Sequence, residues 1–214
     1  MKLMHVLALG VAMLAQGPTP ASVLMTAGQP AELSIRAAGE HSIRVTLKPV
    51  TFAADFPPTP AVVDRGYPAP AIRLRSLSRP MQQRVGRLRV EVRPSPLTVT
   101  ITNMAGQLVQ TLVFGPDGTL AFALDGQPVL GMGEGGPRPA PGTPWREQSV
   151  QFDRRGALDT MESRWQSDMY GSRNPAAVLM GTGGWGLFVA TPWVHVDLRD
   201  AARGVFIPRP PTDA

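Results

Sequence analysis

The sequence predicts an all-β protein, and more narrowly an antiparallel β-sandwich, from three observations. Apolar residues occur in short runs of four to eight rather than in long stripes with helical spacing. Glycine and proline, which interrupt helices, account for 22 and 23 of the 214 residues. Turn sequences recur roughly every ten residues, as is typical of sandwiches. A chain of this length is able to bury a substantial core.

The predicted strands begin with two segments, 31–37 and 41–48, separated by Gly39. In the second segment apolar residues alternate with polar ones, which indicates a strand buried on one face. Two proline-rich stretches, 56–60 and 67–70, exclude a helix and predict a crossover. Further strands are expected at 72–77, 85–92, 97–102, 108–114, 119–124, 177–182, 185–191, 194–198 and 204–207.

The connections between the middle strands are turn sequences. Proline and serine occur in 93–96, asparagine and glycine occur in 103–107, and Gly-Pro-Asp-Gly forms 115–118. These turns predict a meander of antiparallel strands. The stretch 131–174 is loop-like by contrast, and a loop of this length inside a compact domain is usually functional.

Two glycine-rich segments, 131–136 and 181–186, match the dinucleotide-binding pattern G-x-G-x-x-G. That pattern binds a pyrophosphate only when its third glycine opens a helix. The first segment runs into prolines and the second into an apolar strand-like run, so neither predicts a nucleotide site. The second segment instead predicts a β-hairpin that places Trp185 and Phe188 near the core.

The positive charge of the chain, formally +5, does not indicate a nucleic-acid partner. Basic residues such as Arg73 and Arg75 alternate with apolar residues, as they do on the solvated face of a strand. A nucleic-acid-binding domain would gather them on one helix or stripe.

Thiol and metal chemistry are equally unsupported by the composition. The chain has no cysteine, which excludes disulfides and a thiol nucleophile, and only three histidines. His195 and Asp197 would share one strand face and offer two metal ligands, but a satisfied surface histidine is the favoured interpretation. We therefore expect no metal site and no cofactor.

The N-terminus is predicted to be a secretory signal peptide covering residues 1–21, with cleavage between 17 and 27. A weakly positive start precedes ten apolar residues, 6–15, which are too few to span a bilayer. The mature protein is therefore expected to be exported to the periplasm or the medium. No membrane contact is expected after cleavage, and the sandwich is expected to cover residues 28–208.

Four motifs occur in a specific order: GMGEGG at 131–136, FDRRG at 152–156, RWQSD at 164–168 and GTGGWGLFV at 181–189. This order resembles the N-terminal region of glycoside hydrolase family 31, the α-glucosidase and α-xylosidase group. The resemblance covers roughly residues 30 to 208 and implies a galactose-mutarotase-like β-sandwich that precedes a catalytic TIM barrel.

The resemblance also implies that this chain lacks the chemistry of the family. The two carboxylates of a retaining glycosidase lie on the barrel, which needs about 250 residues. We therefore assign no catalytic residue, interpret 209–214 as the start of a linker to the absent barrel, and expect the chain to be inactive alone.

The family's N-terminal domain contributes a loop to the sugar pocket, which by position corresponds to 165–175. Trp165 and Tyr170 would stack on a sugar ring, and Asp168, Arg173 and Asn174 would bind hydroxyl groups of an α-linked glycoside. Taken singly, each residue is interpreted first as structural, with Trp165 as a core anchor. The loop as a whole is interpreted as lying close to substrate.

Other interpretations stay open at this point. Asp153, Arg154 and Arg155 of the second motif are interpreted as a structural ion-pair corner. An alternative function for the chain is a free carbohydrate-binding or interaction module that needs no barrel. A mutarotase-like epimerase is the least favoured function, because outside the predicted signal only His41 and His195 are available as acid and base.

Overall fold

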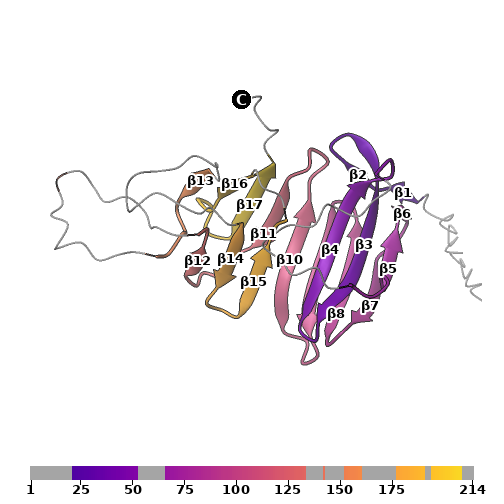
Figure 1. Ribbon diagram of the computed structural model, residues 1–214, viewed down its shortest axis with the longest axis horizontal. Coiled ribbons are helices and arrows are strands. Elements are labelled where there is room, and N and C mark those ends of the chain that lie inside the picture. The colour runs from indigo at the N-terminus through magenta and orange to yellow at the C-terminus, as the bar shows by residue number, and fades with distance from the viewer. Residues whose placement is uncertain are drawn as a thin grey trace, which may run out of the picture.

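The computed structural model describes residues 21–52, 66–133, 142, 152–160, 177–190 and 194–208. Within these ranges every regular element is a β-strand, and all the strand pairs are antiparallel. The all-β fold class is therefore confirmed, and the described residues contain neither a TIM barrel nor a helix that could cross a membrane. Figure 1 shows the strands arranged in two layers.

One layer is a large sheet of eight strands in the order β13-β16-β17-β11-β10-β9-β8-β7. Its strands are β7 (Met81–Val85), β8 (Leu88–Pro94), β9 (Leu97–Asn103), β10 (Leu108–Phe114), β11 (Leu120–Ala123), β13 (Leu158–Thr160), β16 (Val194–Asp197) and β17 (Arg203–Pro208). The pairing of β11 with β17 joins the middle of the chain to the last strand of the described residues.

The other layer consists of two separate small sheets. The first, called here the β3–β4–β5 sheet, contains β2 (Met25–Thr26), β3 (Gln29–Gly39), β4 (Ser42–Pro49) and β5 (Ile72–Leu74). The second, the β12–β14–β15 sheet, contains β12 (Val129–Gly131), β14 (Val178–Gly181) and β15 (Trp185–Phe188). A short pair, β1 (Ser22–Val23) with β6 (Ser76–Leu77), lies beside the first.

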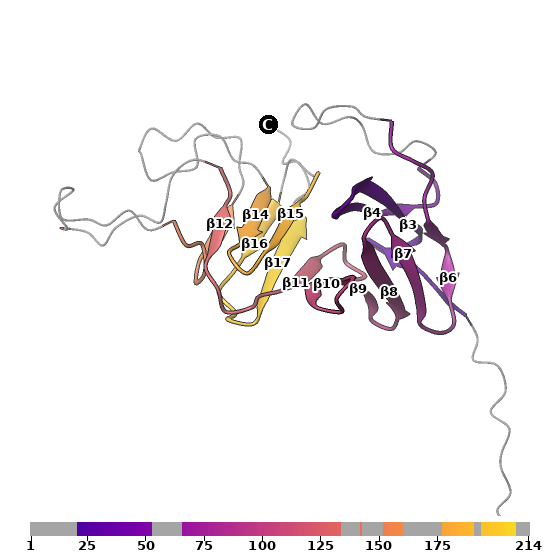
Figure 2. The ribbon, with the colours of Figure 1, turned by 90° about the horizontal axis from the view of Figure 1, so that it is seen from below.

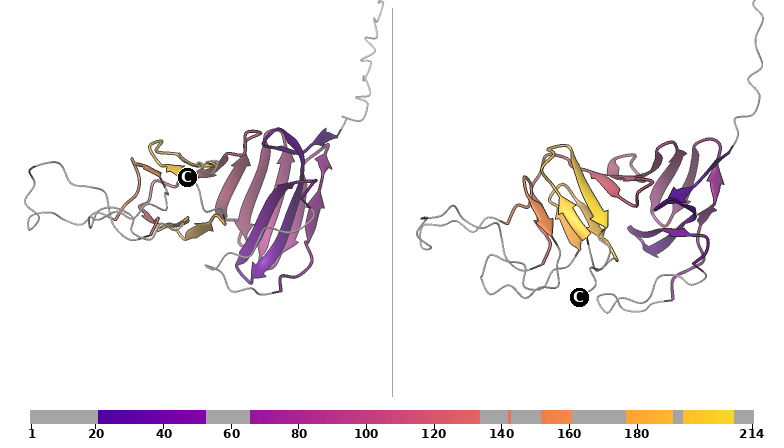
Figure 3. Two further views of the ribbon diagram at one scale, coloured as in Figure 1. Left: turned by 45° about the horizontal axis from the view of Figure 1, so that its top comes forward. Right: turned by 90° about the horizontal axis from the view of Figure 1, so that it is seen from above.

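Both small sheets lie on the same side of the large sheet, one over each half, as Figure 2 and Figure 3 show. The β3–β4–β5 sheet lies over β7 to β9, and the β12–β14–β15 sheet lies over β11, β16 and β17. Each pair of layers buries the inward residues of its strands, which follow the two-residue period of β structure.

The core beneath the β3–β4–β5 sheet is aliphatic, whereas the core beneath the β12–β14–β15 sheet is aromatic. Leu33 and Ile35 are fully buried in the first half, together with Val90 and Val99 of the large sheet. In the second half the Phe122 ring contacts Phe206 with ring centroids 5.0 Å apart and meets Trp185 edge-on at 5.9 Å. Trp185 therefore joins its small sheet to the large one.

A buried glutamine lies where β10 and β11 diverge. The ladder shifts between Leu108 and Gln110, so that Gln110 points inward and is nearly inaccessible. Its side-chain amide donates to the carbonyl oxygen of Ala123 at 3.2 Å and accepts from the Ala123 N–H at 2.8 Å. The amide thus replaces the main-chain ladder at a point that links the two halves.

Most predicted strands are confirmed, but three predictions were wrong in detail. The stretch 131–174, expected to be a loop, contains the short strand β13, which pairs with β16. The expected strand 85–92 is a hairpin in which Val85 pairs with Leu88, so that Gly86 and Arg87 form a two-residue turn. Gly86 has φ +60°, a conformation that glycine tolerates, and its value as a turn signal was missed. The expected strand 72–77 divides into β5, which pairs with β3, and β6, which pairs with β1.

Candidate functional site

The five residues predicted to bind sugar, Trp165, Asp168, Tyr170, Arg173 and Asn174, lie outside the described residues, so their role stays a prediction. The structure does describe where that part of the chain leaves and returns. It leaves from β13, the edge strand of the large sheet, and returns at β14, the central strand of the β12–β14–β15 sheet. The chain around these two points forms the candidate site.

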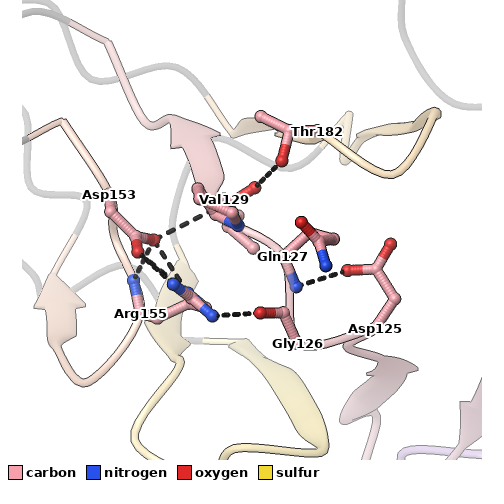
Figure 4. A network of polar contacts seen from close by, with 8 residues as sticks. Asp125, Gly126, Gln127, Val129, Asp153, Arg155 and Thr182 are labelled. Carbon is pink, nitrogen blue, oxygen red and sulfur yellow. Dashed lines mark hydrogen bonds and ion pairs between the residues drawn. The ribbon is translucent and has the colours of Figure 1, made fainter.

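The turn of the FDRRG motif is built around the carboxylate of Asp153 (Figure 4). This carboxylate accepts hydrogen bonds from the backbone N–H of Val129 at 3.0 Å and of Arg155 at 3.2 Å. The Arg155 guanidinium donates to it from Nε at 2.9 Å and from Nη2 at 2.6 Å. The Arg155 hydrogen bond, followed by the bond from Val129, lowers the pKa of Asp153 to about 2.

Arg154 points in the opposite direction, into the protein. Its residue is 6% exposed, and its Nε donates to the carbonyl oxygen of Gly131 at 3.0 Å. Its backbone N–H donates to the carbonyl oxygen of Val129 at 2.7 Å. A buried guanidinium requires such partners because burial without them is costly. The prediction of a structural ion-pair corner is confirmed, with Arg154 as its buried anchor.

Two further turns are attached to this Asp153 corner. Asp125 caps the first of them by accepting from the Gln127 N–H at 3.0 Å. The N–H and the hydroxyl of Thr182 both donate to the carbonyl oxygen of Pro128, at 3.0 Å and 3.2 Å. The turn before β12, the FDRRG turn and the β14–β15 turn are therefore fastened to one another (Figure 4).

This geometry defines a clamp rather than an acid–base pair. Arg155 and two backbone N–H groups occupy the Asp153 carboxylate, and its lowered pKa keeps it ionised at neutral pH. A general acid would need a raised pKa and a free carboxyl oxygen. The corner can fix the ends of neighbouring loops, which is what a recognition loop requires.

The predicted β14–β15 hairpin is confirmed, and its glycines have distinct tasks. Gly184 has φ +102° in the turn, and its N–H donates to the carbonyl oxygen of Gly181 at 3.0 Å. A Cβ at Gly181 would lie 2.1 Å from the indole of Trp185, so only glycine lets the ring pack there. Trp185 is buried as expected.

The prediction that Phe188 lies near the core was wrong. Phe188 is three residues beyond Trp185 in the same strand, so the two side chains point to opposite faces. Phe188 is 42% exposed, and Met180 on the neighbouring strand is 51% exposed. With the half-buried Leu130 and Val178, which pair beside them, they form the apolar outer face of this sheet.

His195 and Asp197 do lie on one face of β16, as expected from their spacing. Asp197 accepts from Arg199 at 2.9 Å and 2.7 Å, and this contact lowers its pKa to about 2. The carboxylate is therefore engaged with its neighbour. Within the described ranges, no group of three histidine, aspartate or glutamate side chains gathers as metal ligands would.

The sequence interpretation missed a cavity of about 330 Å³ on the outer face of the β3–β4–β5 sheet. The arginines treated as a solvated strand face belong to its wall. Among the described residues it is lined by Glu32, Ser34, Arg36, Lys48, Val50, Phe52, Arg73 and Arg75. The cavity depends on pairing between strands that are distant in sequence, because Arg75 donates to Glu32, which lies 43 residues earlier.

No family model matches this sequence, and no curated protein matches it. Solved structures do match it. The fold is similar to that of the GH31 dextranase of Flavobacterium johnsoniae, solved as a mutant complexed with isomaltotriose and as a complex with glucose. Each comparison gives a TM-score of 0.58 and 14% sequence identity, and covers 83% of this chain and 22% of that chain.

At this level of identity the likeness shows the fold. The chain has a fold related to that of this GH31 dextranase, which supports the resemblance noted in the sequence at the level of the fold. It spans less than a quarter of the length of the solved enzyme.

Proposed function

We propose that this chain is the β-sandwich domain of an exported family 31 α-glycoside hydrolase of the α-glucosidase type. In this proposal it gives the enzyme a loop of the substrate pocket and a docking surface for a catalytic barrel. The observation that carries the proposal is the coverage: 83% of this chain matches 22% of a dextranase chain. Most of that enzyme therefore has no counterpart here.

The apolar outer face of the β12–β14–β15 sheet supports the docking part of the proposal. Met180 and Phe188 are exposed on adjacent strands, beside Val178 and Leu130. Contiguous exposed apolar side chains commonly mark a contact surface in soluble proteins. We assign this face to the rest of the enzyme, because the solved enzyme of the same fold is more than four times longer than the matched part.

The Asp153 corner supports the substrate-loop part. It fastens three turns at the Thr182 end of β14, and the chain enters the other end of the same strand at Val178 after residues 165–174. A loop carried by a rigid sheet requires less ordering of its scaffold when it binds a ligand. We propose that Trp165 and Tyr170 stack on an α-linked sugar and that Asp168, Arg173 and Asn174 bind its hydroxyl groups.

The proposal also includes export of the protein and the following boundaries between its segments. Residues 1–21 act as a signal peptide, 28–208 form the sandwich, and 209–214 begin a linker to the barrel. The catalytic carboxylates belong to that barrel, so the chain alone does not hydrolyse glycosides. The alternative function is a free carbohydrate-binding module.

The test combines an assay with the coding sequence beyond codon 214. We expect no hydrolysis of an aryl α-glucoside by the purified chain, and a downstream reading frame that encodes a barrel. A stop codon at that point, together with binding of isomaltotriose by the isolated chain, would replace the proposal with the free binding module. Hydrolysis by the chain alone would contradict the assignment of catalysis to a barrel.

A further inference from the structure

The outer face of the β3–β4–β5 sheet is polar and carries the cavity described above. Across the strands of this sheet, whose outer face is turned to the viewer in Figure 1, Glu32 lies opposite Lys48, and Ser34 lies opposite both Thr46 and Arg73. Directly opposed residues share one face, so these side chains form two adjacent rows. The cavity of about 330 Å³ is as large as a pocket for a ring-sized molecule.

The charges around this cavity are unbalanced towards positive. Glu32 is the one carboxylate among its described lining residues, and two guanidinium groups share it. Arg75 binds it closely, with Nε 2.8 Å from Oε2, whereas Arg73 Nε lies 3.7 Å from Oε1, which is too far for a hydrogen bond. The Arg73 side chain is 60% exposed, so its guanidinium donors are accessible at the mouth of the cavity.

Arg36 and Lys48 add positive charge to the same wall. We assign the ligand contact to Arg73, because its side chain is 60% exposed and its Nε lies beyond hydrogen-bond distance of Glu32.

The floor of the cavity offers a hydroxyl group. Ser34 is 5% exposed and lines the cavity, and its neighbour Thr46 is equally buried. Neither hydroxyl forms a hydrogen bond within the described part of the chain. Because Ser34 lines the cavity, its hydroxyl is available as a hydrogen-bond donor and acceptor to a polar occupant.

The rim of the cavity is apolar on one side. Phe52 is 53% exposed and Val50 is 39% exposed, and both line the cavity. An exposed aromatic ring beside hydrogen-bond donors is suited to a ligand with one flat apolar surface and several polar groups. A bare inorganic ion would use the arginine and leave the aromatic rim without a contact.

We propose that this cavity binds a small organic oxyanion of about one ring in size. Arg73 binds its carboxylate or phosphate group, the Ser34 hydroxyl donates to a polar group on the ring, and the ring lies against Phe52. A guanidinium forms paired hydrogen bonds with either kind of oxyanion, so the two share one recognition chemistry. Residues of β3, β4 and β5 and of the chain just after β4 and β5 line this cavity, and its proposed ligand does not depend on the proposed function.

The experiment is a calorimetric titration of the purified full chain with four probes: glucuronate, glucose 6-phosphate, inorganic phosphate and glucose. We expect at least one of the two charged ring compounds to bind more tightly than both inorganic phosphate and neutral glucose. A preference between the two identifies the oxyanion as a carboxylate or a phosphate. The affinity should fall as salt is added, because Arg73 is exposed at the mouth.

Three variants test the assignment. Arg73→Gln should weaken binding about tenfold, the usual effect of losing a hydrogen bond between charged partners. Arg89→Gln makes the same change of charge at an exposed position on the other face of the large sheet, and should leave binding unchanged. Glu32→Gln removes a neighbouring negative charge and should tighten binding, a result that damage to the fold would not produce.

Several outcomes would overturn the proposal. They are equal binding of glucose and the charged compounds, equal binding of inorganic phosphate and the ring compounds, and no binding of any probe. An equal loss of affinity in Arg73→Gln and Arg89→Gln would also overturn it, because the attraction would then reflect only the net charge of the chain.

Discussion

The two small sheets occupy equivalent positions over the large sheet, yet their outer faces differ in chemistry. The β3–β4–β5 sheet presents charged and hydroxyl side chains around a cavity, whereas the β12–β14–β15 sheet presents Leu130, Val178, Met180 and Phe188. Burial against the large sheet dictates only the inner face of each strand. Packing against the large sheet does not constrain the outer faces. The chemistry of each outer face therefore indicates the kind of molecule that it contacts.

The same contrast is present in the sequence. In β3 the apolar residues Leu33 and Ile35 alternate with polar ones, as in a strand with one solvated face. In β14 and β15 both faces are apolar, which is typical of strands that are covered on both sides. The difference between the two sheets therefore supports a covering partner for the second sheet alone.

The largest effect is expected at Phe122, which joins the large sheet to Trp185. Phe122→Ala should lower the free energy of unfolding by about 3–5 kcal/mol, because it removes a fully buried ring and leaves a cavity. The near-ultraviolet circular dichroism of the tryptophans should weaken, because Trp185 loses its ring partner. Leu33→Ala removes a buried side chain from the β3–β4–β5 sheet, and it should destabilise the protein without this spectral change. Equal spectra for both variants would contradict the assigned contact.

Asp153→Asn should lower the free energy of unfolding by about 1–3 kcal/mol, since Arg155 and two backbone N–H groups lose an ionised acceptor. The pKa of Asp153 is lowered in the folded state to about 2, so its contribution is complete above the ordinary value near 3.8. The contribution is lost as the pH falls from 3.8 towards 2. Urea unfolding at several pH values measures this loss.

Asp197→Asn provides the matched control for that prediction. Asp197 also has its pKa lowered to about 2 by an arginine two residues further on, but Arg199 is 61% exposed, whereas Asp153 also accepts from the N–H of Val129, 24 residues away. Because an exposed local pair stabilises a fold very little, we expect a change below about 1 kcal/mol. Equal losses in the two variants would contradict the view that the Asp153 corner is a tertiary clamp.

Gln110→Leu should cost a comparable amount, about 1–3 kcal/mol, at the junction between the two halves. The change leaves the part-buried N–H and carbonyl group of Ala123 without their side-chain partner. Gln107→Leu alters the same residue type in an exposed turn and should have little effect. Urea unfolding compares the two, and an unchanged midpoint for Gln110→Leu would show that the amide is dispensable.

The smallest effect on stability is expected at the apolar outer face. The double variant Met180→Gln with Phe188→Gln should change the free energy of unfolding by less than about 0.5 kcal/mol per position, since both side chains are largely exposed. It should nevertheless reduce dye binding and aggregation of the isolated chain. Leu108→Gln, at a residue 59% exposed on the large sheet, is the control and should change neither.

The fold was predictable from the sequence wherever apolar residues alternate over several positions, as in β3, β4, β9 and β10. Prediction failed at Val85–Leu88, where a two-residue turn interrupts an apolar run, and at the three-residue strands β12 and β13. Segments this short are too brief to show an alternation of apolar and polar residues, and their position depends on tertiary pairing.

The prediction of the candidate sites was limited by the same dependence on tertiary pairing. The FDRRG corner was predictable because adjacent opposite charges in a turn tend to pair. The cavity was not predictable, because it requires Glu32 and Arg75 to meet through the pairing of β3 with β5. Phe188 was misplaced because proximity to Trp185 in sequence was given more weight than the alternation of strand faces.

The most direct test of the proposed docking surface is hydroxyl-radical footprinting of this chain alone and of the complete product of its gene. Met180 and Phe188 should be oxidised readily in the chain alone and be strongly protected in the complete protein. Phe52, three residues beyond β4 of the other small sheet, and Met104, in the turn between β9 and β10, are both exposed in this structure and should react equally in both samples. Unchanged oxidation of Met180 and Phe188 in a complete protein that includes a barrel would contradict the proposal that this face is its docking surface.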